Sequence, residues 1–315
     1  MTEITEEFLK KILLWRINDS HKANYGHLLI IAGCQNMPGA AVLATTAALQ
    51  SGCGLVTLHS TERALDSAAV NCPSAMLSYN PGNCISEMPA NMDKYSAICI
   101  GPGIGQSPET SNVLSNILTF SKSSGIPLLI DADALNLLAK KPDEMANIGE
   151  WSILTPHPGE LRRLFKGMES LDDNIFHNTG KLPEVKESIG EKDKNNSSSY
   201  SANTPIENAI FDLCKVTNST IIAKGYLSKV FSPSGKIFKN STGGPGLAKA
   251  GSGDVLSGLT AGLMARGYIG VNAALLGTWI HGKAGDILSE QRTMESFSSF
   301  DLANNLFQAF KLLYQ

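Results

Sequence analysis

Short, uninterrupted apolar runs separated by helical patterns are the feature that most restricts how this chain can fold. Residues 28–31 (LLII) and 55–58 (LVTL) flank the alanine-rich segment 39–51, and the same order continues through Ala97–Ile100 and 127–130. Continuous apolar strands are typical of a parallel sheet covered on both faces, because neither side of such a strand meets water. The sequence therefore predicts an α/β fold with helices on both faces of a mostly parallel sheet.

The second half of the chain adds a different signal. Strands are predicted at 152–154, Thr220–Ala223 and Lys229–Phe231, and the turn sequence SPSG at 232–235 leads into another apolar pair at 237–238. A turn of this kind between apolar runs is typical of an antiparallel hairpin, which we expect at one edge of the sheet. The predicted helices after residue 100 cover 110–121, 134–139, 255–265, 273–288 and 302–313.

A polar stretch at about 168–204 interrupts the alternation. It is rich in acidic, lysine, asparagine and serine residues and has few apolar side chains to bury. We interpret it as a solvated loop or insertion, with a regulatory or partner-binding role as the alternative. Because the α/β pattern continues on both sides, residues 1–315 are predicted to form a single domain.

The composition disfavours several classes of function. The chain has 26 Lys and Arg against 29 Asp and Glu and no dense basic block, so we expect neither nucleic acid nor an anionic membrane as a partner. No apolar segment reaches the roughly 18 residues of a membrane span. The cysteines form no CxxC pair and the histidines show no zinc-site spacing. These features predict a cytoplasmic protein whose partners are small molecules.

The most informative segment is glycine-rich and runs directly into a predicted helix. It ends in Gly251-Ser252-Gly253-Asp254, which presents backbone N–H groups at the positive end of a helix dipole, an arrangement that binds phosphate. Asp254 would accept a proton from a hydroxyl while the neighbouring amides stabilise a transferring phosphoryl group. The alternative is that Asp254 only stabilises the helix dipole.

Further loops follow predicted strands, at the edge where α/β folds bind ligands. They are a glycine loop at 101–105, a pair of carboxylates at Asp131 and Asp133, and a segment 155–160 in which two prolines fix the backbone around His157. Lys224 ends another strand, where it could meet a nucleotide phosphate. Either carboxylate could orient a magnesium ion through water, with a helix N-cap role for one of them as the structural alternative. The structural alternatives for the other segments are a tight turn for the glycine loop, a satisfied structural histidine for His157 and a solvated lysine for Lys224.

Taken together, these segments resemble the NAD(P)H-hydrate dehydratase family of the ribokinase-like superfamily. The combination of TPHPGE at 155–160 with GSGD at 251–254 is specific, whereas neither half is specific alone. The resemblance covers nearly the whole chain except the insertion. It implies a ribokinase-like three-layer α/β/α sandwich in which substrate and nucleotide meet above the carboxyl ends of the strands.

The resemblance also implies a role for each matched residue. The residues that match the family's contacts with the hydrated nicotinamide nucleotide are Ala40, Gly103, His157 and Asp254. Those that match its adenine-nucleotide site are Lys224, Gly225, Tyr226, Leu227, Ser228 and Gly253. Gly251 to Gly253 would form the phosphate loop, and Glu160 lies where related kinases help to hold Mg²⁺, through water or phosphate.

The implied activity is repair of NADHX and NADPHX, the hydrated forms of NADH and NADPH. Asp254 would deprotonate the ring hydroxyl of the S-form as it attacks the terminal phosphoryl group of ADP or ATP, with Mg²⁺. The ring nitrogen would then expel phosphate and restore NAD(P)H. The resemblance also suggests a homotetramer, a separate epimerase that supplies the S-form, and ADP as the donor.

Other functions stay open at this point. A ribokinase-like kinase of a vitamin or sugar alcohol would share the GSGD chemistry but release a stable phosphate ester. A nucleotide-binding regulatory protein would need no catalytic groups, and the presence of Asp254, His157 and Lys224 argues against it. A Rossmann dehydrogenase is disfavoured because residues 33–38 (GCQNMP) do not supply GxGxxG after the first predicted strand.

Overall fold

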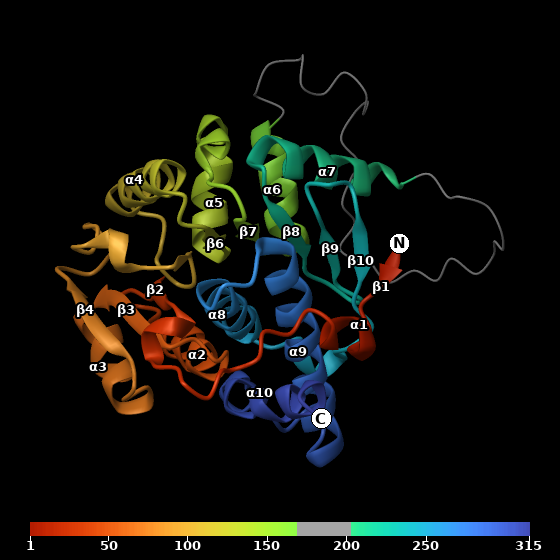
Figure 1. Ribbon diagram of the computed structural model, residues 1–315. Coiled ribbons are helices and arrows are strands. Elements are labelled where there is room, and N and C mark those ends of the chain that lie inside the picture. The colour runs from red at the N-terminus through yellow and green to blue at the C-terminus, as the bar shows by residue number, and fades with distance from the viewer. Residues whose placement is uncertain (169–202) are drawn as a thin grey trace.

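One mixed sheet organises the residues that the computed structural model describes, 1–168 and 203–315 (Figure 1). Its strands are β1 (Thr2–Glu3), β2 (His27–Ile31), β3 (Leu55–Thr61), β4 (Met76–Asn80), β5 (Ala97–Ile100), β6 (Leu128–Ile130), β7 (Ile153–Leu154), β8 (Thr220–Ala223), β9 (Lys229–Phe231) and β10 (Ile237–Lys239). Within these ranges they form ten strands in the order β1-β10-β9-β8-β7-β6-β5-β2-β3-β4.

All neighbouring strands from β4 across to β8 are parallel. Leu28 on β2 lies opposite both Val56 and Ala97, so the carboxyl ends of these strands meet at the same edge of the sheet. The predicted hairpin is confirmed, because β9 pairs antiparallel with β10. It is not the outermost element, however, because β1 pairs with β10 and extends the sheet by one short strand. A two-residue strand is too short to leave an apolar pattern in the sequence.

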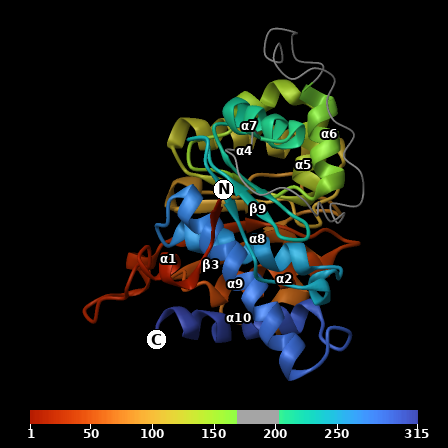
Figure 2. The same cartoon turned by 90° about the vertical axis from the view of Figure 1, so that its right-hand side faces the viewer.

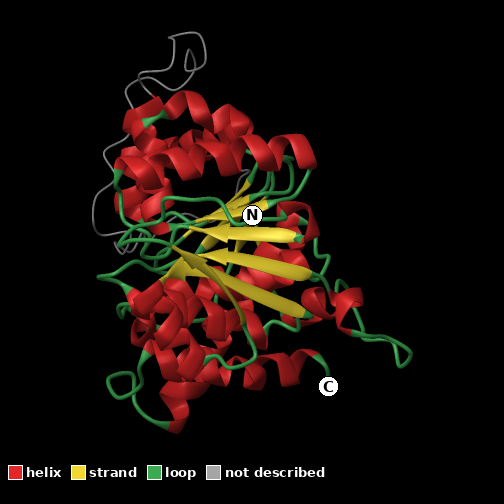
Figure 3. Cartoon of the chain, turned by 90° about the vertical axis from the view of Figure 1, so that its left-hand side faces the viewer, coloured by secondary structure: helices red, strands yellow, loops and turns green. Residues whose placement is uncertain are grey.

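Helices cover both faces of the sheet (Figures 2 and 3). The helices of the described residues are α1 (Glu6–Lys10), α2 (Pro38–Gln50), α3 (Glu62–Asn71), α4 (Pro108–Ser124), α5 (Ala132–Lys140), α6 (Pro158–Met168), α7 (Pro205–Thr217), α8 (Ser252–Ala265), α9 (Gly270–Gln291) and α10 (Ser299–Leu313). Helices α4 to α7 form one outer layer, and α2, α3, α8, α9 and α10 form the other.

Strand β2 shows why the sheet is covered on both sides. Leu28 and Ile30 are fully buried in the core under α2 and α8, while Leu29 and Ile31 are fully buried in the core under α4 and α5. A strand whose alternate side chains enter two separate cores must be apolar throughout, as the sequence predicted.

The predicted insertion falls between two helices. Helix α6 ends at Met168 and α7 begins at Pro205, so residues 169–202 lie outside the described residues. Among the helices that are described, none combines the length and apolar character needed to cross a bilayer.

Candidate active site

The loops singled out in the sequence meet at the carboxyl edge of the parallel strands. Residues 101–105 follow β5, Asp131 follows β6, 155–160 follow β7 and Lys224 follows β8. Because β5 to β8 are neighbours in the sheet, these loops stand side by side although they span more than 120 residues of sequence. The amino end of α8, with the GSGD segment, completes this edge.

Asp254 lies in the first turn of α8. Gly251 is the N-cap and has a φ of 88°, a left-handed conformation that glycine adopts without strain. Burial raises the pKa of the Asp254 carboxyl to about 7, and repulsion from Asp131 adds to the rise while Lys224 opposes it. A carboxyl group with a pKa near the working pH is well suited to general-base catalysis.

Lys224 points inward, toward carboxylates. Its Nζ donates to Asp131 Oδ1 at 2.7 Å and lies 3.8 Å from Glu160 Oε2. A Cβ placed on Gly253 would be 3.4 Å from the same Nζ, so the lysine borders the phosphate loop. Burial alone would lower the pKa of Lys224, but attraction to Asp131 and Glu160 raises it, which keeps the ammonium group charged.

His157 and Glu160 form a compact pair at the start of α6. Glu160 Oε2 accepts from the His157 backbone N–H at 2.7 Å, and His157 Nε2 lies 3.3 Å from Glu160 Oε1. The Gly159 N–H donates to His157 Nδ1 at 2.9 Å, which assigns the ring proton to Nε2. Burial lowers the pKa of His157, as does the positive charge of Lys224. Burial also raises the pKa of Glu160 to about 7.

Asp131 lies at the centre of these contacts, although the sequence left its role open. It is 1% exposed and accepts hydrogen bonds from Lys224 Nζ and from Ser257 Oγ at 2.6 Å. It stands at the N-cap position of α5, as one of the two sequence interpretations allowed, but its side chain makes no capping hydrogen bond. Ser257 was missed; its position three residues after Asp254, on the same helix face, is the signal that could have found it.

A cavity of about 730 Å³ lies beside the GSGD segment. The sequence-predicted residues that line it are His157, Lys224, Gly225, Tyr226, Ser228, Ser252 and Gly253. Leu227 is not among the lining residues and has a φ of 57°, so it serves the turn that carries its neighbours. The volume is that of an ordinary small-molecule site.

Ala40 and Gly103 lie close together, but neither residue lines this cavity. A Cβ placed on Gly103 would lie 2.8 Å from Ala40 Cβ, so the two loops are in contact. The loop of Gly103 is also close to the acidic groups, because Gly105 N–H donates to Asp133 Oδ2 at 3.0 Å. Asp133 in turn contributes to the raised pKa of Asp254. Ala40 and Gly103 therefore lie near an acidic neighbour of Asp254 and do not line the large cavity.

Helix α9 holds the glycine-rich loops in place. His281 Nε2 lies 2.9 Å from the Ser252 carbonyl oxygen, and burial lowers the pKa of this imidazole to about 4. Asp286 accepts from the Gly243 N–H through both carboxylate oxygens, at 3.1 and 3.0 Å. The motif 281–286 (HGKAGD) therefore positions both ends of the segment 243–252.

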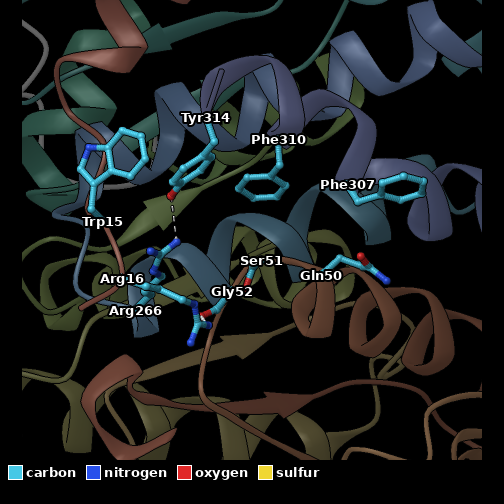
Figure 4. A pocket seen from close by; sticks show the side chains of 9 residues that line it. All are labelled: Trp15, Arg16, Gln50, Ser51, Gly52, Arg266, Phe307, Phe310 and Tyr314. Atoms are coloured by element: carbon cyan, nitrogen blue, oxygen red, sulfur yellow. Dashed lines mark hydrogen bonds between the residues drawn. The ribbon is translucent and has the colours of Figure 1, made fainter. Parts of the chain in front are cut away.

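Another hollow, of about 380 Å³, lies away from this edge, near the amino end of β3 (Figure 4). It is lined by Trp15, Arg16, Gln50, Ser51, Gly52, Arg266, Phe307, Phe310 and Tyr314. Arg266 donates to the Leu14 carbonyl oxygen and to the Tyr314 hydroxyl, which ties the N-terminal segment to α10. The sequence-predicted residues gather at the carboxyl edge of the sheet and not at this hollow, so that edge is the candidate active site.

Comparison with known proteins decides the family. The family model described as NAD(P)H-hydrate dehydratase matches residues 28–308. The chain belongs to this family. It is 32% identical over 278 residues to the ADP-dependent (S)-NAD(P)H-hydrate dehydratase of Neisseria meningitidis, covering 87% of this chain and 81% of that protein.

Solved structures agree with the assignment to the NAD(P)H-hydrate dehydratase family. The ADP/ATP-dependent enzyme of Bacillus subtilis, crystallised with ATP and Mg²⁺, has a TM-score of 0.75 at 25% identity and covers 99% of this chain and 98% of its own. A ribokinase-like superfamily protein of Enterococcus faecalis has a TM-score of 0.76 at 22% identity, covering 99% and 96%, and shows the same fold. The predicted ribokinase-like fold is confirmed. The chain spans about half the length of the first curated relatives it matches, which are named bifunctional NAD(P)H-hydrate repair enzymes.

Proposed function

We propose that this chain is a lyase that dehydrates the S-form of NADHX and NADPHX, with ADP or ATP as the phosphoryl donor. The observation that carries the proposal is Asp254, a buried carboxyl with a pKa raised to about 7, in the first turn of the helix that borders a nucleotide-sized cavity. Family membership supports the reaction, and the Neisseria meningitidis relative supports ADP.

The reaction begins with transfer of a phosphoryl group. Asp254 takes the proton of the ring hydroxyl as its oxygen attacks the terminal phosphorus, and the bond from phosphorus to the departing AMP or ADP breaks. The amides of Gly251 to Gly253 stabilise negative charge on the transferring group. Lys224, fixed by Asp131 at 2.7 Å, adds a positive charge beside the phosphate loop.

Elimination follows. The ring nitrogen donates its lone pair, the carbon–oxygen bond breaks and inorganic phosphate leaves; loss of a proton from the neighbouring carbon restores NAD(P)H. Phosphorylation makes this possible, because hydroxide is a poor leaving group whereas phosphate is a good one. The donor leaves as AMP from ADP, or as ADP from ATP.

Magnesium fits this edge as a phosphate-bound ion. The described residues hold no group of three or more His, Cys, Asp or Glu side chains arranged around a metal position. Mg²⁺ usually keeps several waters and takes only one or two carboxylates together with substrate phosphates. Both Glu160 oxygens are already engaged by His157, so Glu160 would hold the ion through water. When bound, the ion would neutralise charge on the phosphates.

The proposed reaction goes together with a cellular location, an epimerase and an oligomeric state. A cytoplasmic location would bring the enzyme to its substrates, and an epimerase activity would convert the R-form to the S-form. A homotetramer is part of the same proposal, and light scattering of the purified protein would test it.

The direct test is recovery of reduced-nicotinamide absorbance. Purified protein, Mg²⁺ and chemically prepared NADHX are mixed with ADP and, separately, with ATP. Recovery with either nucleotide, together with release of phosphate, would support the dehydratase and identify its donor. No recovery with either nucleotide, despite nucleotide binding, would reject it. A stable phosphate ester as product would instead indicate a kinase of a vitamin or sugar alcohol.

A further inference from the structure

A cavity of about 490 Å³ lies beside α5 and α6, on the face of the sheet opposite α8 and α9. The side chains that line it include Gln106, Asn136, Lys140, Arg163 and Lys166. Lysine and arginine thus provide three of its lining residues, and no carboxylate from the described part of the chain lines it. The nucleotide-sized cavity beside the GSGD segment is a separate space with different lining residues.

The three positive charges of this cavity have no ionic partner among the described residues. Lys140 Nζ donates to the amide oxygen of Gln106 at 2.8 Å, and Arg163 Nε donates to the amide oxygen of Asn136 at 2.7 Å. These amides are neutral, so they orient the cations without forming an ion pair with them. A concave surface with one sign of charge attracts a ligand of the opposite sign.

The cavity adjoins the loop that carries Gly103. Gln106 follows that loop, and its Nε2 donates to Asp133 Oδ1 at 3.0 Å. The other oxygen of Asp133 accepts from the Gly105 N–H, also at 3.0 Å. Gln106, which lines the cavity, is therefore connected through Asp133 to the loop that the family resemblance assigns to substrate binding.

The cavity also adjoins the loop that carries His157. Arg163 Nη2 lies 3.8 Å from the position of a Cβ on Gly159, two residues after His157. The positive charge of Arg163 reaches both site residues, since it helps to lower the pKa of His157 and the pKa of Glu160. His157 lines the nucleotide-sized cavity, and Arg163, which approaches the same loop, lines the cationic cavity.

We propose that Lys140, Arg163 and Lys166 bind phosphate groups of the dinucleotide substrate, beyond its nicotinamide ring. This inference rests on the proposed function. Arg163 and Lys166 are three residues apart on α6 and so share one helix face, and Lys140 faces them from α5. A guanidinium fork and two ammonium groups match a phosphate well. The bound group is either the pyrophosphate, present in both substrates, or the 2′-phosphate of NADPHX.

The test uses the full chain and the stable dinucleotides NADH and NADPH, whose fluorescence reports binding without turnover. All three cations are changed to glutamine, as Lys140→Gln, Arg163→Gln and Lys166→Gln together. Arg163 and Lys166 are exposed, as is Lys140, so the fold should persist. The matched control is Lys311→Gln, an exposed lysine on α10 in the opposite layer.

We expect the triple variant to bind about tenfold more weakly or worse, as the loss of charge-assisted hydrogen bonds to phosphate predicts. Equal weakening for NADH and NADPH assigns the pyrophosphate, and weakening for NADPH alone assigns the 2′-phosphate. The affinity for ADP and the behaviour of the control should match the wild type. The KM for the hydrated substrates should rise by the same factor, with little change in kcat.

Unchanged affinity of the triple variant for both dinucleotides would overturn the inference. So would a wild-type protein that binds neither of them, or an equal loss of affinity in the Lys311→Gln control. A wild type that binds NADH through these cations yet restores none from NADHX would instead contradict the proposed function alone. The binding and turnover measurements therefore separate the two failures.

Discussion

The chemistry of the site depends on several carboxyl groups that surround one ammonium group. Asp131, Glu160 and Asp254 are carboxyl groups gathered around the single ammonium of Lys224, within the described residues. Burial and mutual repulsion raise the pKa of both Glu160 and Asp254 to about 7, so the group favours holding a proton near neutral pH. Two carboxyl groups that titrate near neutral pH would make catalysis at this site sensitive to pH in the physiological range.

The pH profile of the activity should report this arrangement. A general base acts in its ionised form, so kcat/KM for NADHX should rise as pH increases through about 7 and then level off. Glu160→Gln removes one negative neighbour, which should lower the pKa of Asp254 and move the rising limb to lower pH. Measuring kcat/KM of the wild type and of Glu160→Gln across this pH range would check this. Rising limbs that superimpose would contradict the coupling between Glu160 and Asp254.

At the residue scale, the functional side chains could be identified from the sequence more readily than the residues that they contact. Asp254, His157 and Lys224 were singled out because each follows a strand or opens a helix, where functional side chains gather. The bond between Lys224 and Asp131 joins residues 93 positions apart and depends on the order of β6, β7 and β8 in the sheet. The side-chain direction of Lys224 therefore required the structure.

At the scale of elements, close packing of α8 on α2 sets the position of Asp254. A Cβ placed on Gly258 would lie 1.9 Å from the Ala44 carbonyl oxygen, and one on Gly262 would lie 2.1 Å from Ser51 Oγ. The glycines let the two helix backbones approach, which small residues at a spacing of four allow. Any side chain at these positions would push α8, and with it the phosphate loop, away from α2.

Gly258→Ala tests this packing. We expect the substitution to lower the free energy of unfolding by about 1–3 kcal/mol, because the added methyl group meets backbone that cannot move aside freely. Urea denaturation would measure the loss. Gly39→Ala on α2 is the matched control, since a Cβ there meets nothing within 4 Å. Similar unfolding midpoints for the two variants would show that the close approach does not constrain α8.

Element boundaries were predictable where most side chains of the element are buried. The predictions for Ala97–Ile100, Thr220–Ala223 and Lys229–Phe231 agree with β5, β8 and β9. Strand β4 was missed because Met76, Leu77 and Tyr79 are exposed, so it lacks a continuous buried run. Helix α8 begins at Ser252 and not at the predicted 255, because its first turn includes Gly253, and glycine is a poor helix former.

At the scale of the whole molecule, the parallel sheet brings loops distant in sequence to a single edge, with the nucleotide-sized cavity beside GSGD and the cationic cavity beside α5 and α6. The three-layer architecture was predictable because a strand that is apolar throughout must be covered on both faces. The strand order and the two cavities were not, since they arise from contacts between elements. The fold alone does not fix the product, because ribokinase-like proteins include kinases.

The central claim is that Asp254 is the base that starts the reaction, and Asp254→Asn tests it most directly. NADH formed from NADHX at saturating ADP is compared for the variant and the wild type, and ADP binding is followed by the rise in melting temperature. We expect turnover to fall by about 10²-fold or more, as loss of a general base predicts, while ADP still stabilises the protein. Turnover close to that of the wild type would contradict the assignment.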